Sequence, residues 1–242
     1  MTYCVGLMLN DGLVLLSDTR TNAGLDNIST YRKMFTFEVP GERAIVIMTA
    51  GSLSVSQTTI AEVTEAISDP GATPETSILL APTMLKVAEV IGNTMARVRA
   101  AIDSKLARLG QTASASLIVA GQRKDGVMRM FLIYPEGNFI EATDDTPFLQ
   151  IGEHKYGKPI LDRIVRPDSS LADGQKAALL SMDSTLRSNL TVGMPLDLCI
   201  IERDAMRVTG ERRIEAGDAD FLEISSAWST ALRDAFFQIK LK

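Results

Sequence analysis

The sequence predicts an α+β fold in which two antiparallel sheets stack face to face and helices cover both outer faces. Two observations on the order of elements predict it. Four β-patterned segments come before any helical pattern, and two helical patterns then follow as a pair. The second half repeats this order of strands followed by paired helices, and ends with a strand region and one closing helix. A doubly wound parallel sheet needs strands that alternate singly with helices, so this order disfavours it.

The first four predicted strands fill the N-terminal part of the chain. Large and β-branched apolar side chains flank Asn10-Asp11-Gly12, a tripeptide typical of a hairpin turn. A polar connection then leads to a second pair of strands, which turn at Pro40-Gly41-Glu42. The predicted strands are residues 2–9, 13–19, 33–39 and 43–50.

The first pair of helices follows from a change of period at Ser52. Apolar residues then recur at helical spacing until Asp69-Pro70-Gly71 ends the pattern, namely Leu53, Ile60, Val63 and Ile67. A longer helix begins near Pro82, because proline is tolerated in a first helical turn. Its apolar stripe runs through Met84, Val87, Ile91, Met95, Val98, Ile102, Leu106 and Leu109 and ends at Gly110.

The second half supplies the remaining strands and helices. The predicted strands are 114–121, 127–134, 138–142, 147–151 and 195–203, with a further one within 206–214. The predicted helices are 153–165, interrupted at 157–159, and 171–187. Asp218 is a predicted cap for a last helix with an apolar stripe of Phe221, Ile224, Trp228, Leu232 and Phe236.

Composition limits the classes of function. No linker or charge block divides the 242 residues, which predicts one domain over residues 1–242. The net charge of -5 is interspersed, so neither a nucleic-acid partner nor a membrane partner is expected. The only cysteines, Cys4 and Cys199, lie in apolar strands and predict buried reduced thiols. With no signal peptide or membrane span predicted, we expect a cytoplasmic protein. His154 is the only histidine, and no metal site is expected.

Polar residues interrupt the apolar strands at three places, Thr2, Asp18 and Lys33. A threonine hydroxyl is a poor nucleophile unless a base is adjacent, and an N-terminal Thr2 carries one in its own amine once Met1 is removed. Removal is expected because the second residue is small. A neighbouring Lys33 ammonium favours the neutral amine, and Asp18 keeps that ammonium paired. The N–H of Gly51, at a strand-to-helix junction, is a candidate donor to an oxyanion. This chemistry needs no cofactor.

The same residues carry a family resemblance. S-D-T-R at residues 17–20, a lysine one strand later, T-A-G at residues 49–51 and a threonine at position 2 resemble the β-subunits of proteasomes and the related bacterial ATP-dependent threonine peptidase. The start M-T-Y-C-V-G and the C-terminal helix are most similar to the Anbu group of bacterial homologues. The resemblance covers the whole chain. It implies the four-layer αββα sandwich of N-terminal-nucleophile hydrolases and peptide-bond hydrolysis through an acyl-enzyme.

Roles for individual residues follow from this resemblance. Thr2 matches the nucleophile, Asp18 and Lys33 the activating pair, and Gly51 the oxyanion donor. Residues that match the substrate groove are Thr21, Asn22, Thr49 and Leu53, and Arg20 matches an arginine that accompanies the aspartate. The chain departs from the family at Ile151-Gly152-Glu153, where a Gly-Ser-Gly turn is usual, and after the fourth helix. The residues expected to substitute there are Glu153, Ser188 and Thr191.

The resulting hypothesis is a threonine peptidase subunit that self-assembles into a homo-oligomeric ring or spiral and cleaves peptides or unfolded proteins. Two alternatives stay open. One is an amidohydrolase of the same fold that acts on a small amide. The other is a catalytically silent assembly scaffold, which a retained Met1 would favour because the amine base is then blocked. Each residue also has an ordinary structural interpretation, such as a strand-end ion pair for Asp18 and Arg20.

Overall fold

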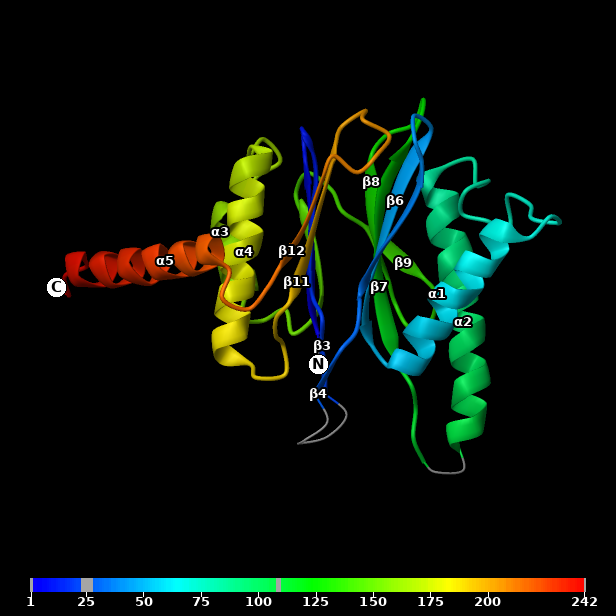
Figure 1. Ribbon diagram of the computed structural model, residues 1–242, viewed down its shortest axis with the longest axis horizontal. Helices are drawn as coiled ribbons and strands as arrows, with labels where there is room; N and C mark the ends of the chain where they lie inside the picture. The colour runs from blue at the N-terminus through cyan, green and yellow to red at the C-terminus, as the bar shows by residue number, and fades with distance from the viewer. Residues whose placement is uncertain (1, 23–27, 108–109, 242) are drawn as a thin grey trace.

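The predicted four-layer sandwich is confirmed by a computed structural model, which describes residues 2–22, 28–107 and 110–241. Figure 1 shows two stacked sheets with helices on both outer sides. The first sheet has the order β10 (Phe148–Gly152), β1 (Tyr3–Leu9), β2 (Gly12–Asp18), β11 (Leu196–Glu202), β12 (Gly210–Ile214). The second has the order β5 (Met34–Val39), β6 (Arg43–Gly51), β7 (Ala115–Arg123), β8 (Arg129–Ile133), β9 (Phe139–Glu141).

Helices cover each sheet on the side that faces away from the other sheet. The pair α1 (Leu53–Ser68) and α2 (Met84–Leu106) packs on the second sheet, and the pair α3 (Lys158–Ile164) and α4 (Leu171–Ser188) packs on the first (Figure 1). The last helix, α5 (Ala219–Gln238), begins on α4 and then leaves the body of the protein as an arm (Figure 1). The sequence therefore predicts the helix, but not its direction.

Three layers of core explain why the strands read as continuous apolar runs. Successive side chains of a strand point to opposite faces of the sheet. On β2, Leu13 and Leu15 face the second sheet, while Val14 and Leu16 face the helices. Both faces of this central strand are therefore buried, and a continuous apolar run is the pattern that such a strand requires.

The structure differs from the expected elements in two places near the N-terminus of β1. A short hairpin of β3 (Arg20–Asn22) and β4 (Ile28–Thr30) occurs in the segment expected to be a polar connection. Three-residue strands are too short to show a period. The helix expected at 153–165 begins only at Lys158, because the N–H groups of Glu153 and His154 bond to Thr2 O and Gly152 O in a turn.

The two thiols are buried, as expected, and neither forms a disulfide. Burial raises the pKa of Cys199 to about 12 and also raises the pKa of Cys4. Because the thiolate is the reactive form, we expect no alkylation of the folded protein by iodoacetamide at pH 8 to 9, and modification of both residues after unfolding in urea. Intact-mass measurement reports both states. Alkylation of the folded protein would contradict the described packing of these strands.

Candidate active site

A buried ion pair joins the two sheets at the edge where β2 ends. Asp18 is the last residue of β2, and Lys33 stands directly before β5 of the other sheet. Lys33 Nζ donates to Asp18 Oδ1 at 2.7 Å. The two residues are only 2% and 0% exposed, respectively. Lys33 is therefore a buried lysine and not a solvent-facing one.

The Asp18 carboxylate also holds the start of β1. Its Oδ1 accepts the N–H of Tyr3 at 3.1 Å, and its Oδ2 accepts the N–H of Gly193 at 3.2 Å. Burial raises the pKa of this carboxyl, while the Lys33 ammonium and the two N–H groups act in the opposite direction. The N–H of Tyr3 belongs to the peptide bond that follows Thr2. The ammonium and the first peptide of β1 thus converge on one oxygen atom.

Lys33 is fixed at both its side chain and its backbone. Its Nζ donates to Arg20 O at 2.5 Å in addition to Asp18, and its carbonyl accepts the N–H of Thr49 at 2.9 Å. The S-D-T-R segment therefore supplies two oxygen acceptors to one ammonium, a carboxylate and a backbone carbonyl. These contacts hold the ammonium in one position between the two sheets.

Thr2 is 7% exposed and is positioned by the turn that follows β10. Its carbonyl accepts the N–H of Glu153 at 2.7 Å. Gly152 has φ +82°, and a Cβ built on it would lie 1.9 Å from Thr2 O. The turn Gly152-Glu153 can therefore approach Thr2 only because residue 152 is glycine. Glu153 therefore contacts Thr2 through its backbone N–H.

Gly51 lies where the sequence places it, at the last position of β6 and two residues before the start of α1. Its φ is +105°, and a Cβ there would lie 2.4 Å from the carbonyl oxygen of Ser114 on the approach to β7. A side chain at position 51 is therefore excluded. The backbone of Gly51 is exposed.

The residues expected along a substrate groove lie on three elements around this edge. Thr21 is half-buried in β3, and the side chain of Asn22 lies outside the described part of the chain. Thr49 is buried and shares a strand face with Ile47, which packs toward α1 and α2. Leu53 is half-buried at the first position of α1. Of these, Thr21 and Leu53 retain exposed surface.

Two residues of the loop between α4 and β11, Leu190 and Gly193, contact the site and were not expected from the sequence. Arg20 Nη1 donates to Leu190 O at 2.9 Å, and Thr19 Oγ1 donates to Pro195 O at 2.7 Å. A Cβ built on Gly193 would lie 2.1 Å from Arg20 Nε, so the loop packs directly on the guanidinium. Only a glycine at this point of the V-G-M-P sequence hints at such an approach.

The two residues expected to supply accessory hydroxyls, Ser188 and Thr191, have other surroundings. Thr191 donates its N–H and its hydroxyl to Asn189 Oδ1, at 3.0 and 2.6 Å. Ser188 is exposed at the end of α4. From this loop it is the backbone of Gly193 that reaches Asp18.

Two features that would indicate other kinds of function are absent from the described residues. None of the helices within them combines the length and the apolar composition that a bilayer crossing requires. Over the same residues, no three His, Cys, Asp or Glu side chains are grouped as metal ligands would be.

Comparison with known proteins decides the family. The profile of the proteasome subunit family matches residues 2–201, a span that includes every candidate site residue. The chain belongs to the proteasome family. A comparison with curated proteins returned no match.

Solved structures refine the position of the chain within the proteasome family. The Gly-1 mutant of Anbu from Hyphomicrobium sp. strain MC1 is 49% identical, with a TM-score of 0.93 over 100% of this chain and 99% of that one. Anbu from Yersinia bercovieri is 41% identical, with a TM-score of 0.91 over 99% of both chains. A helical assembly of the Anbu complex from Pseudomonas aeruginosa is 45% identical, with a TM-score of 0.93 over 99% of this chain and 98% of that one. These similarities support its place among the Anbu proteins, bacterial homologues of the proteasome.

Proposed function

We propose that this chain is the subunit of a threonine peptidase that hydrolyses peptide bonds through Thr2 once Met1 has been removed. The observation that carries the proposal is the buried carboxylate of Asp18, which binds the Lys33 ammonium and the peptide that follows Thr2 through one oxygen atom. An ion pair with a purely structural role does not need to contact the peptide that follows Thr2. A catalytic pair does, because the ammonium must act on Thr2, the residue directly before β1.

The chemistry follows from the amine of Thr2. An α-amino group has a reference pKa of about 7.7 to 8.0, and a nearby ammonium favours its neutral form. The neutral amine takes the proton of Thr2 Oγ as that oxygen attacks the substrate carbonyl carbon. The N–H of Gly51 donates to the oxyanion, a contribution of about 2.7 to 4 kcal/mol in comparable sites. The peptide C–N bond then breaks, the leaving amine takes the proton, and water hydrolyses the remaining ester.

The chain is proposed to work as a homo-oligomer in the cytoplasm. The P. aeruginosa relative forms a helical assembly, and the 45% identity over nearly the whole chain supports an open spiral of the same kind here. The reduced, buried cysteines suit a reducing compartment. Thr21, Leu53 and the exposed backbone of Gly51 are the proposed surface for an extended peptide or an unfolded segment.

Covalent labelling tests the nucleophile. We expect an epoxyketone, which reacts with a hydroxyl and a free amine on the same residue, to add once per chain to the peptide that begins at Thr2. Peptide mapping by mass spectrometry identifies the site. Thr2→Ala removes the label and keeps the fold, whereas Thr36→Ala, at an exposed threonine of β5, keeps both.

The same samples separate the alternatives. If the intact mass of the native chain includes Met1, the amine is blocked and the scaffold hypothesis holds instead. If Thr2 is labelled but a small amide is turned over in preference to peptides of several residues, the amidohydrolase hypothesis holds.

A further inference from the structure

Tyr3, the first residue of β1, has a strand partner on one side only. It is paired with Gly152 of β10, whereas the pairing of β1 with β2 begins one residue later, at Cys4. On the side without a strand partner, its N–H donates to Asp18 Oδ1 instead. The ends of a chain fray unless other contacts tie them down. The position of Thr2, directly before this strand, therefore depends on what else holds Tyr3.

The side chain of Tyr3 belongs to a row of hydrogen bonds that reaches α4. Ser181 Oγ donates to Ala178 O at 2.8 Å, so its single proton is used there. Tyr3 Oη lies 3.1 Å from Ser181 Oγ and must therefore be the donor between these two hydroxyls. The phenol oxygen in turn accepts a hydrogen bond from Gln150 Nε2 of β10 at 2.6 Å. The hydroxyl thus ties the start of β1 to both β10 and α4.

The surroundings of this hydroxyl are closed to solvent. Tyr3 and Ser181 are both 0% exposed. A Cβ built on Gly157, the residue before α3, would lie 2.6 Å from Tyr3 Oη, so the turn that leads into α3 packs directly on the hydroxyl. Burial raises the pKa of Tyr3 to about 12, which keeps the hydroxyl protonated as the donor that this arrangement requires. Loss of the oxygen would deprive the Gln150 amide of its short hydrogen bond.

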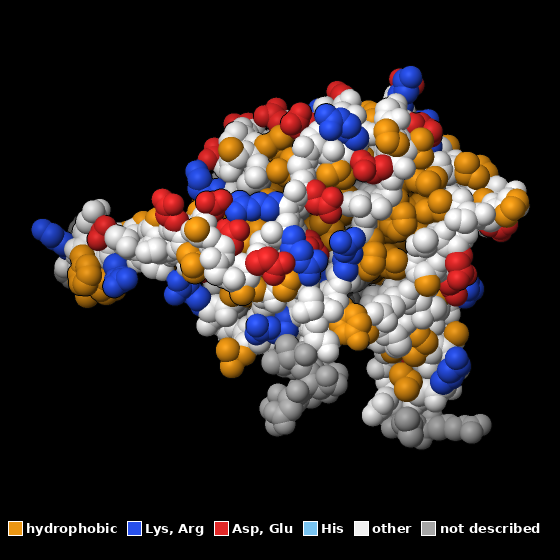
Figure 2. Space-filling view, viewed as in Figure 1, with side chains coloured by type: hydrophobic (Ala, Val, Ile, Leu, Met, Phe, Trp, Pro, Cys, Tyr) orange, Lys and Arg blue, Asp and Glu red, His pale blue; other side chains and the backbone are white. Residues whose placement is uncertain are grey.

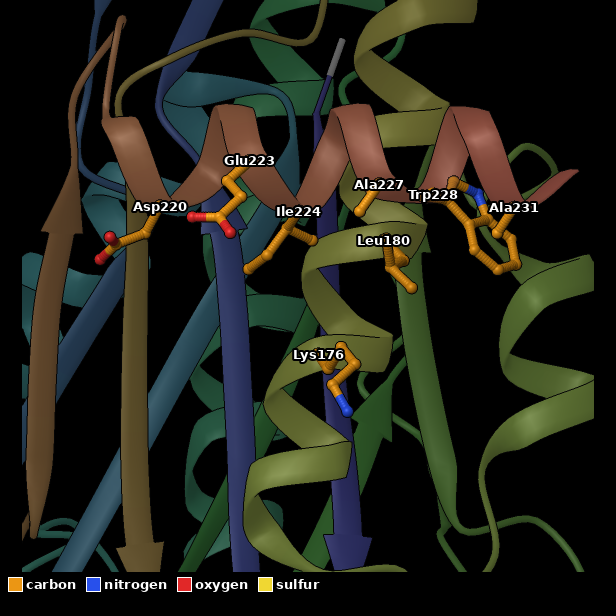
Figure 3. A pocket seen from close by; sticks show the side chains of 8 residues that line it. All are labelled: Lys176, Leu180, Asp220, Glu223, Ile224, Ala227, Trp228 and Ala231. Carbon is orange, nitrogen blue, oxygen red and sulfur yellow. The ribbon is translucent and has the colours of Figure 1, made fainter. Parts of the chain in front are cut away.

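The helix that carries Ser181 is itself fixed from its other side. In Figure 3, Leu180, the residue before Ser181, faces α5 across the crevice between the two helices. Ser225 Oγ of α5 donates to Asp183 Oδ1 of α4 at 2.7 Å. Because α4 has contacts on both sides, it is a firm support for the hydroxyl of Tyr3.

We propose that the Tyr3 hydroxyl is a positioning group for the Thr2 nucleophile, a role that rests on the proposed peptidase function. The peptide between these two residues is bound at both of its polar groups. Thr2 O accepts the N–H of Glu153 at 2.7 Å, and the N–H of Tyr3 donates to Asp18. The hydroxyl holds β1 in the position in which both bonds form. The Thr2 amine then stays where the ammonium of Lys33 acts on it.

The rate of epoxyketone labelling tests this role in the full chain. We expect Tyr3→Phe to lower kinact, the maximal rate constant of labelling at Thr2, by about tenfold or more, because a small displacement of a reacting group costs a large factor in rate. The KI of the probe should stay within about twofold, since the proposed groove at Thr21 and Leu53 is unchanged. Tyr134→Phe, between β8 and β9 of the other sheet, is the matched control and should keep both values. A hydroxyl with only a structural role would lower the urea midpoint and leave kinact unchanged, and that result overturns the proposal.

Ser181→Ala keeps the test decisive if Tyr3→Phe folds poorly. It removes the acceptor of the phenol proton, and we expect kinact to fall by at least about threefold. The double variant should lose no more than Tyr3→Phe alone, because both changes break the same row of hydrogen bonds. Native kinact in Ser181→Ala, or single losses that multiply in the double variant, would overturn the proposal.

The molar mass in solution is measured for each variant, because α5 packs on α4 and gathers exposed hydrophobic side chains at its outer end (Figure 2). We expect the native mass throughout, and a loss of kinact confined to variants with an altered mass contradicts a positioning role. If the native chain carries no label at Thr2, the proposed function and this role fail together. If it is labelled and Tyr3→Phe keeps its kinact, this role alone fails.

Discussion

Replacing Asp18 by alanine is expected to lower the free energy of unfolding by about 3 to 5 kcal/mol, because it leaves the buried Lys33 ammonium without its carboxylate. It also removes the acceptor of the Tyr3 and Gly193 N–H groups. Epoxyketone labelling of Thr2 should fall to background. Urea denaturation at pH 7 measures the first effect, and mass spectrometry the second. A loss below about 1 kcal/mol is typical of an exposed pair and would contradict the described burial.

A double-mutant cycle separates stability from chemistry at this pair. Lys33→Met should also be strongly destabilising, since it leaves the Asp18 carboxylate buried without a cation. Asp18→Asn combined with Lys33→Met should recover much of the stability, because removing both charges of a buried pair costs far less than removing one. Labelling should stay absent in the double variant. If it returned, Asp18 and Lys33 would have no part in activating Thr2.

Gly152→Ala is expected to displace the start of β1 and lower the free energy of unfolding by more than about 3 kcal/mol. The left-handed conformation at φ +82° alone costs an alanine about 1 to 2 kcal/mol. The added Cβ would also lie 1.9 Å from Thr2 O, so the backbone of β1 or β10 must move. The hydrogen bond from Glu153 N to Thr2 O should break, and labelling should be lost.

Gly41→Ala is the matched control for this prediction. Gly41 has a similar φ of +78°, but nothing lies within 4 Å of a Cβ built there. The free energy of unfolding of Gly41→Ala should therefore fall only by the conformational cost, about 1 to 2 kcal/mol, and labelling of Thr2 should be unchanged. Equal losses at both glycines, measured by urea denaturation, would show that contact with Thr2 adds nothing.

Local patterning predicted most of the fold because the periods that define strands and helices are properties of neighbouring residues. The apolar runs around Val14 and Ile47 are strands with two buried faces, and their order indicated two stacked sheets. The Asp218 cap was also predictable, and its carboxylate accepts the N–H of Phe221 at 3.0 Å. The β3–β4 hairpin was not, since three residues give no period.

Part of the candidate site was predictable because its polar residues interrupt apolar strands. Asp18 and Lys33 stand out in this way, and the structure brings them together. Gly193 does not stand out in the sequence, because it enters the site through its backbone N–H, 175 residues after the carboxylate that it binds. Glu153 was expected as a substitute for the usual serine of the turn, and its hydrogen bond to Thr2 comes from its backbone N–H, which a residue of any type can supply.

The sequence by itself determined the elements, their order and the chemical groups available at the start of the chain. Only the tertiary structure decided that one carboxylate oxygen serves both Lys33 and the peptide after Thr2, and that α5 projects from α4 with the outer part of its apolar stripe exposed. The physical reason is the distance along the chain over which each kind of interaction acts. Side-chain periodicity acts over a few residues, whereas these contacts depend on how distant strands and helices stack, which no local pattern specifies.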